Sequence, residues 1–329
     1  MKIVKRLLSV VLLFVMLCSG GNVAVAADMS IAYDAKKIYP LTIQSDDWFE
    51  YSVPQKNEIL SLDAKELNQM TDEQLVRAIA DYPYLVDIYV CDDLSDGLEQ
   101  FEETCDAFGQ LMKRENGVEN FIKYSQNIIS EMKEKPREDG RTEFVVLALS
   151  DIMSQLRESE NLENVNNQTR SASPRTPKGT FVPYLNIAET HTDAFHITRD
   201  NEVIRTYGVK FIRNGSCKYN CHSYAWYSTS SSNEYWINDP SVYMSDGSYK
   251  KVYSGSVSKA INSYGVKSSS KVYYANNTHS ALFIDDPSSG TALGKLKVRS
   301  KWGQLGVFEH TVTNVPSGYD YSTVSIWQY

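Results

Sequence analysis

Apolar residues recur at spacings of three and four through the first half of the chain, from about residue 57 to residue 157. Thr71 and Gln74 form a capping box ahead of one apolar stripe, and Pro83 ends that helix at or before the preceding residue. Further amphipathic segments follow at 98–112, 118–132 and 144–156. Four such helices with short connections predict an all-α bundle over 57–157.

The pattern changes after this bundle. Residues 158–179 are rich in Asn, Ser, Thr and Pro, which predicts a linker. Beyond it, apolar and polar residues alternate with a period of two, and this alternation predicts an α+β domain with an antiparallel sheet over 180–329. The expected elements are strands at 278–284, 295–302 and 306–312, short strands or a packing strap between 182 and 212, a helix at 256–264 and, before the bundle, a short strand at 41–43.

The chain begins with a pattern typical of a secretory signal peptide over 1–27. Lys2, Lys5 and Arg6 precede an apolar run, and Ala24-Val25-Ala26 offers a cleavage site. The alternative, a membrane anchor, is disfavoured because the apolar run is short. The composition is otherwise that of a globular protein, and the net charge of −8 argues against a nucleic-acid binder. We therefore expect a secreted or cell-surface protein without a lasting membrane anchor.

The candidate chemistry centres on Cys221, which follows the turn-favouring Asn220 and opens an aromatic run typical of a buried helix. Backbone N–H groups at a helix start stabilise a thiolate and an oxyanion. Secretion also permits disulfides, so a Cys217–Cys221 bridge would occupy this nucleophile, and Cys91–Cys105 is a second candidate bridge. These readings stay open at the level of sequence.

His279 begins a strand-like run with apolar residues on both faces, where an imidazole needs a partner. Cys221 is the best candidate, because a Cys–His pair lets the histidine take the thiol proton and later protonate a leaving amine. A third residue should orient the imidazole. Ser300 and His310, each on the inward face of a later strand, are the two candidates. The alternative for His279 is a core histidine bonded to the backbone.

Several strings resemble a known family. YNCHSYAWY, YWINDPSVYMSDGSY, HSALF and SKWGQLGVFEH are similar to secreted Firmicutes proteins related to NlpC/P60 and CHAP cysteine peptidases, and DYPYLVDIY is similar to the helical region that often precedes such domains. The resemblance implies a papain-like fold and a secreted cysteine hydrolase that cleaves amide bonds in peptides or peptidoglycan, without a cofactor. Residues expected to contact substrate are Tyr219, His222, Trp236 and Trp302.

Two other interpretations compete with the enzyme. One is a catalytically silent papain-like module that binds an extracellular partner. The other is a zinc site built from Cys217, Cys221, His222 and His279, although the C-x3-C-H spacing is not a common zinc signature. His191 and His196 lie in a polar setting and are expected at the surface.

Overall fold

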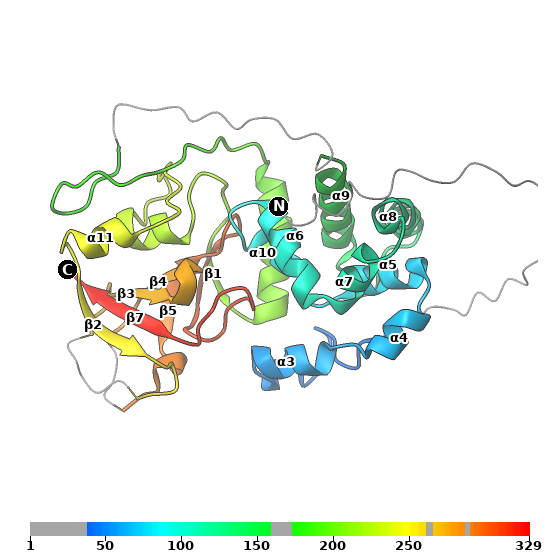
Figure 1. Cartoon of the computed structure of the whole chain (residues 1–329), viewed down its shortest axis with the longest axis horizontal. Coiled ribbons are helices and arrows are strands. Elements are labelled where there is room, and N and C mark those ends of the chain that lie inside the picture. The colour runs from blue at the N-terminus through cyan, green and yellow to red at the C-terminus, as the bar shows by residue number, and fades with distance from the viewer. Residues whose placement is uncertain (1–37, 159–172, 261–265, 287–289) are drawn as a thin grey trace, which may run out of the picture.

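The computed structural model describes residues 38–158, 173–260, 266–286 and 290–329 (Figure 1). The predicted signal peptide and most of the predicted linker lie outside these residues. So does the second half of the helix expected at 256–264, whose described part, 256–260, forms a turn and a bridge instead.

The first half is helical, as predicted. The capping box forms, since Thr71 N donates to Gln74 Oε1 at 2.8 Å, and the helix it starts ends at Tyr82, before Pro83. The helix expected over 98–112 is broken by Cys105, whose backbone is extended, and no strand forms at 41–43. The elements are η1 Trp48–Glu50, α3 Val53–Leu60, α4 Ala64–Gln69, α5 Asp72–Asp81, η2 Leu85–Tyr89, α6 Leu94–Thr104, α7 Asp106–Met112, α8 Gly117–Glu134 and α9 Thr142–Glu158.

The second half contains a seven-stranded sheet in the order β1-β6-β5-β4-β3-β7-β2, with every pairing antiparallel. Its strands are β1 Lys210–Arg213, β2 Lys250–Gly255, β3 Lys271–Tyr274, β4 Ser280–Phe283, β5 Lys297–Lys301, β6 Val307–Thr311 and β7 Val324–Gln328. One face packs on the helical half, and the other is covered by η3 Ser223–Tyr227 and α11 Ser241–Ser245. The α+β class with an antiparallel sheet is therefore confirmed.

Helix α10, Asp193–Tyr207, stands between the sheet and the helical half (Figure 1) and contacts α9, η2 and β1. The sequence pattern did not predict this helix, because short strands or a packing strap were expected between 182 and 212; in that range a strand does form at β1, which includes Phe211 and Ile212. Thr192 caps the start of the helix and Gly208 ends it in the left-handed conformation, at φ 62°. The helix lacks an apolar stripe because its buried side includes His196, Arg199, Asp200 and Glu202.

The two halves share one hydrophobic core. It joins residues such as Ile79 and Leu149 from the helices to Val272, Trp302 and Ile326 from the second half. The predicted bundle and the predicted α+β domain are therefore packed around one core and not two. No helix within the described residues is long and apolar enough to cross a membrane.

A buried ion pair ties α10 to the helical half. Arg141 Nε donates to Glu202 Oε1 at 2.6 Å, and the two side chains are 2% and 1% exposed. Replacing Arg141 with Met leaves the Glu202 carboxylate buried with only Arg205 nearby, at 3.8 Å. We expect a loss of about 3–5 kcal/mol in the free energy of unfolding, measured by urea denaturation.

Two variants control this prediction. Arg77→Met removes a more exposed pair, with Glu131, and should cost about 1 kcal/mol or less. The double variant Arg141→Met/Glu202→Met should recover most of the loss, because no charge is left buried. An Arg141→Met variant that is no less stable than Arg77→Met would contradict the prediction.

Candidate active site

Asn220 builds the start of the helix that carries Cys221. Its Oδ1 accepts from Ser223 N at 3.1 Å, its Nδ2 donates to Ile237 O at 2.9 Å, and its carbonyl accepts from Tyr224 N at 3.0 Å. Cys221 therefore lies in the first turn of a helix that continues as η3, as the sequence predicts.

The Cys221 thiol is buried and uncharged at neutral pH. Burial is the main cause that raises its pKa to about 12, and Asp92 raises the pKa further. Backbone N–H groups of Ser280 and His222 act in the opposite direction but do not outweigh burial. All four cysteines among the described residues are free, so neither candidate disulfide is present.

His279 lies immediately before β4 and is fully buried. Its ring stacks on Tyr319, with centroids 4.0 Å apart and planes 9° apart, and Tyr274 meets it edge-on at 5.0 Å. Among the residues the structure describes, neither ring nitrogen has a hydrogen-bond partner. Burial, followed by His310 and His222, holds the His279 pKa well below 6.5.

The hydrogen bond expected between Cys221 and His279 is therefore not formed. Strand alternation explains this, because Ser280 faces the helix of Cys221 while His279 turns toward Tyr319 on the other face of the sheet. Cys221 is among the groups that raise the pKa of Tyr274 and Tyr319, the two aromatic residues that contact His279. Cys221 and His279 are not bonded to each other.

Ser300 and His310, the two candidates for orienting His279, bond to each other instead. Trp302 Nε1 donates to Ser300 Oγ at 3.0 Å, Ser300 Oγ lies 2.7 Å from His310 Nε2, and His310 Nδ1 lies 2.8 Å from Thr311 O. The carbonyl requires a proton on Nδ1, so Nε2 accepts from the serine hydroxyl. The His310 ring centroid is 6.5 Å from that of His279.

A matching chain lies on the opposite face of the sheet. Trp226 Nε1 donates to Ser280 Oγ at 2.9 Å, Ser280 Oγ lies 2.8 Å from His222 Nδ1, and His222 Nε2 donates to Asn277 O at 3.2 Å. Both nitrogens of His222 are occupied, so this histidine holds the helix on β4. Burial is the main cause that lowers the pKa of His222, like that of His310, to about 4.

The four residues expected to contact substrate are all buried, His222 included. Tyr219 lies beneath the Lys301 ammonium, with Nζ 5.2 Å from the ring centroid. Trp302 is 0% exposed and packs edge-on against Tyr207 at 5.1 Å, and Trp236 is 1% exposed. In this conformation no substrate reaches any of the four side chains.

The sequence analysis missed a group of buried charges beside this site. Lys301 Nζ donates to Ser216 O at 2.9 Å and to Gly303 O at 2.7 Å, and Asp200 accepts from the backbone N–H groups of Gly215 and Gly306. Burial is the main cause that lowers the Lys301 pKa to about 7 and raises the Asp200 pKa to about 6. In the sequence, these buried charges are indicated only weakly, by the charged Lys301 at the inner end of an apolar strand.

His196 corrects the expectation of a surface histidine. It is 3% exposed, its Nε2 lies 3.0 Å from Glu189 Oε1, and its Nδ1 accepts from Arg199 Nη2 at 3.2 Å. His191 is partly buried and stacks on Phe195 at 3.9 Å. Within the described part of the chain, no three or more His, Cys, Asp or Glu side chains are placed to hold a metal ion, so the zinc arrangement is not assembled there.

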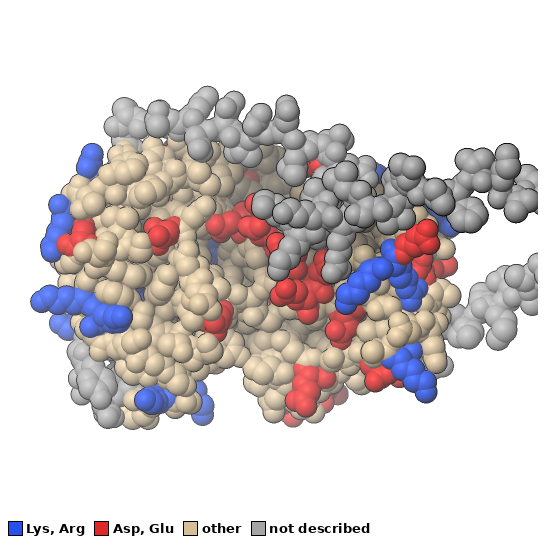
Figure 2. Space-filling view, viewed as in Figure 1, with Lys and Arg blue, Asp and Glu red and all other residues tan. Residues whose placement is uncertain are grey.

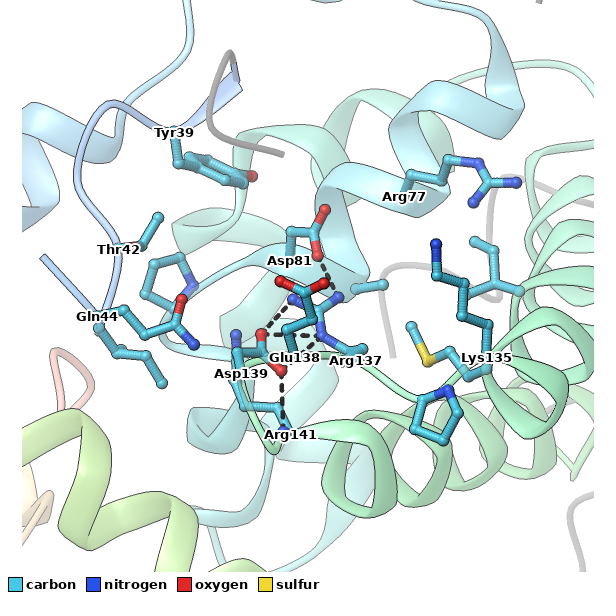
Figure 3. Close-up of a pocket in the computed structure, with 16 residues that line it drawn as sticks. Tyr39, Thr42, Gln44, Arg77, Asp81, Lys135, Arg137, Glu138, Asp139 and Arg141 are labelled. Carbon is cyan, nitrogen blue, oxygen red and sulfur yellow. Dashed lines mark hydrogen bonds and ion pairs between the residues drawn. The ribbon is translucent and has the colours of Figure 1, made fainter. Parts of the chain in front are cut away.

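A hollow of about 490 Å³ lies in the helical half, and Cys221 is not among the residues that line it (Figure 3). Its wall carries four basic side chains (Arg77, Lys135, Arg137 and Arg141) and three acidic ones (Asp81, Glu138 and Asp139), and Arg137 bonds to Asp81 and Asp139. Both signs of charge are mixed in the wall, so the hollow offers no single sign of charge to a ligand.

The hydrogen-bonded chain Trp302–Ser300–His310 predicts that replacing Ser300 will destabilise the fold. Ser300→Ala leaves His310 Nε2 with only Trp302 Nε1 at 3.4 Å, inside the core. We expect a loss of about 1–3 kcal/mol in unfolding free energy. Ser130→Ala, at an exposed helical serine, is the matched control and should change stability by less than about 0.5 kcal/mol. Equal losses in the two variants would count against the chain.

Comparison with known proteins adds no relative. No family model matches the chain, and no match is found among the curated proteins or the solved structures. The architecture thus defines the class: an α+β protein whose antiparallel sheet is covered on one face by helices and on the other by the segment that carries Cys221.

Proposed function

We propose that this protein is a secreted cysteine hydrolase with a papain-like arrangement, which cleaves amide bonds through Cys221 and His279. The observation that carries the proposal is the position of Cys221 in the first turn of a capped helix. The backbone N–H of Ser280 acts on its thiol, and His279 is the residue directly before Ser280. This arrangement offers a nucleophile, backbone donors and an imidazole in one small region.

The reaction would proceed in two steps, formation of a thioester and its hydrolysis. The Cys221 thiol gives its proton to His279, and the thiolate attacks the amide carbonyl carbon. The C–N bond breaks, the amine leaves with the proton from the imidazolium, and a thioester remains. Water then attacks the thioester, which releases a carboxylic acid and restores the thiol. Backbone N–H groups at the helix start are placed to stabilise the oxyanion of each step.

The described conformation corresponds to a resting state of such an enzyme. The thiol is protonated, the imidazole is neutral, and the His279 ring is held on Tyr319. Proton transfer requires the ring to leave this stack and turn toward Cys221. This movement takes the ring from its contacts with Tyr319 and Tyr274 toward the side of the sheet that the helix of Cys221 covers.

Peptides and peptidoglycan are the proposed substrates, on the strength of the sequence resemblance, and the signal peptide would place the enzyme outside the cell. The test is release of new amino groups from crude peptidoglycan and from peptide libraries by the mature chain. The proposal expects products that depend on Cys221. Products that form equally well with folded Cys221→Ser would overturn it.

A catalytically silent binding module is the second candidate. It is favoured by the two observations that an active pair would not share: a thiol with a raised pKa and an imidazole with no hydrogen bond. An electrophilic peptide aldehyde separates the two. A hydrolase should form a hemithioacetal at Cys221, visible in a crystal structure with His279 turned toward it, whereas a silent module should leave the thiol free.

A further inference from the structure

A segment of the helical half, Tyr89–Asp92, contacts the second half at Gly303, Gln304 and Tyr319. We name it the strap. Its backbone carbonyls are held one after another: Tyr89 O accepts from Gln304 N at 3.3 Å, Val90 O from Tyr319 Oη at 2.9 Å, and Asp92 O from Gln304 Nε2 at 3.3 Å. The second half thus holds the backbone of this segment through one backbone N–H group and two side chains.

Gly303 shows how closely the strap approaches. Its φ is 46°, and a Cβ at this position would collide with the carbonyl oxygen of Val90. The neighbouring Lys301 fixes the same turn through its bond to Gly303 O. The second half is therefore shaped to receive a backbone at this point.

The strap ends with a carboxylate in a polar pocket. The Asp92 side chain accepts hydrogen bonds from Trp236 and from Asn220, the residue that caps the Cys221 helix. Asp92 is partly buried, and its charge is the largest single charge acting against ionisation of Cys221. The Asp92 carboxylate thus acts electrostatically on the thiol.

The strap also reaches His279 through Tyr319. The Tyr319 hydroxyl is bonded to Val90, and the face of its ring stacks on the imidazole. Displacement of the strap would release Tyr319 and allow His279 to turn. One segment therefore restrains both members of the proposed pair. The strap runs into α6, over which Figure 2 shows acidic side chains; Asp93, Asp96, Glu99 and Glu103 are exposed there.

We propose that the strap occupies the substrate groove as an internal ligand, and that the groove takes a peptide with an acidic side chain in the pocket of Asn220 and Trp236. This inference rests on the proposed function of the same site. In the resting chain Asp92 fills the pocket, and a substrate carboxylate replaces it when the strap leaves. The strap thus inhibits the resting protein, and its Asp92 side chain indicates which substrate side chain the groove prefers.

The experiment measures alkylation of Cys221 in the full chain by iodoacetamide, with the modified thiol located by peptide mass. Asp92→Ala should accelerate alkylation of Cys221 by about tenfold or more, because it opens the pocket and removes the charge that opposes the thiolate. Asp92→Asn, which keeps the shape, should give a smaller increase. Glu99→Gln, at an exposed acid of α6, is the matched control and should leave the rate unchanged.

A second arm tests the ligand class. N-acetyl-aspartate amide should restore protection of Cys221 in Asp92→Ala by refilling the pocket, whereas N-acetyl-asparagine amide at equal concentration should not. Circular dichroism of each variant establishes that it is folded. An unchanged alkylation rate in both folded Asp92 variants would overturn the inference, and equal protection by the two amides would overturn the acidic preference.

Neither arm depends on hydrolysis, so the two proposals fail separately. If alkylation and protection are as expected but no variant cleaves an amide, the hydrolase proposal fails and the proposal that the strap is an internal ligand stands. If hydrolysis depends on Cys221 but is unaffected by Asp92→Ala and shows no preference for acidic residues in the substrate, the hydrolase proposal stands and the proposal about the strap fails.

Discussion

Cys221→Ser is expected to abolish amide hydrolysis, because a serine hydroxyl is a far poorer nucleophile unless its base is tuned for it. His279→Ala should lose nearly as much activity, and the double variant should be no worse than either single one, because nucleophile and base act as a unit. The measurement is the rate of amine release by each variant at equal concentration, with folding checked by circular dichroism.

His222→Gln is the matched control for this result. His222 is adjacent to Cys221 and equally buried, but both its nitrogens are bonded within the fold, so its loss should reduce stability more than the activity of the folded fraction. Full activity in a folded Cys221→Ser protein would end the cysteine-hydrolase proposal. An inactive, well-folded His222→Gln together with an active His279→Ala would transfer the role of base to His222.

Replacing His310 is expected to make the free energy of unfolding fall less steeply as the pH is lowered. The pKa of His310 is lowered from 6.5 to about 4, mainly by burial. Between these two pH values the unfolded chain binds a proton at this residue and the folded chain does not, so the stability present above pH 6.5 is lost as the pH falls toward 4. The expected loss from this one residue is roughly 3 kcal/mol.

The comparison must be made between variants, because other groups act in the opposite direction. Burial raises the pKa of Asp87 to about 7 and that of Asp200 to about 6, so these carboxyls gain stability as the pH falls. Their contributions cancel when wild type and His310→Gln are measured by urea denaturation at each pH. The wild type should lose about 3 kcal/mol more than the variant between pH 6.5 and pH 4. Parallel curves would show that His310 is not neutral in the fold.

Local patterns were sufficient to predict much of the fold. The capping box at Thr71, the stop at Pro83 and the two faces of β4 depend on neighbouring residues alone, and each is present in the structure. The position of Cys221 at a helix start follows from Asn220 in the same way. The proposed nucleophile could therefore be located from a short stretch of sequence.

The rest depends on partners distant in the chain. The buried side of α10 carries Asp200 and Glu202, and these charges are stable there because the backbone N–H groups of Gly215 and Gly306 lie opposite Asp200 and Arg141 lies opposite Glu202. Likewise, nothing near His279 in the sequence indicates that Tyr319 will stack on it, and nothing near Asp92 indicates its pocket. Such pairings are set by tertiary packing, which spacing along the chain does not encode.

The bond between Tyr319 and Val90 spans 229 residues, and this has a consequence for the order of folding. Contacts so distant in sequence form slowly, and during synthesis the later residue is made long after the earlier one. The helices can form early, but Val90 and its neighbours cannot be covered until the chain has emerged as far as Tyr319. The nascent protein should therefore keep an open, chaperone-accessible surface along the strap, and should acquire protease resistance there only once the final strands are in place.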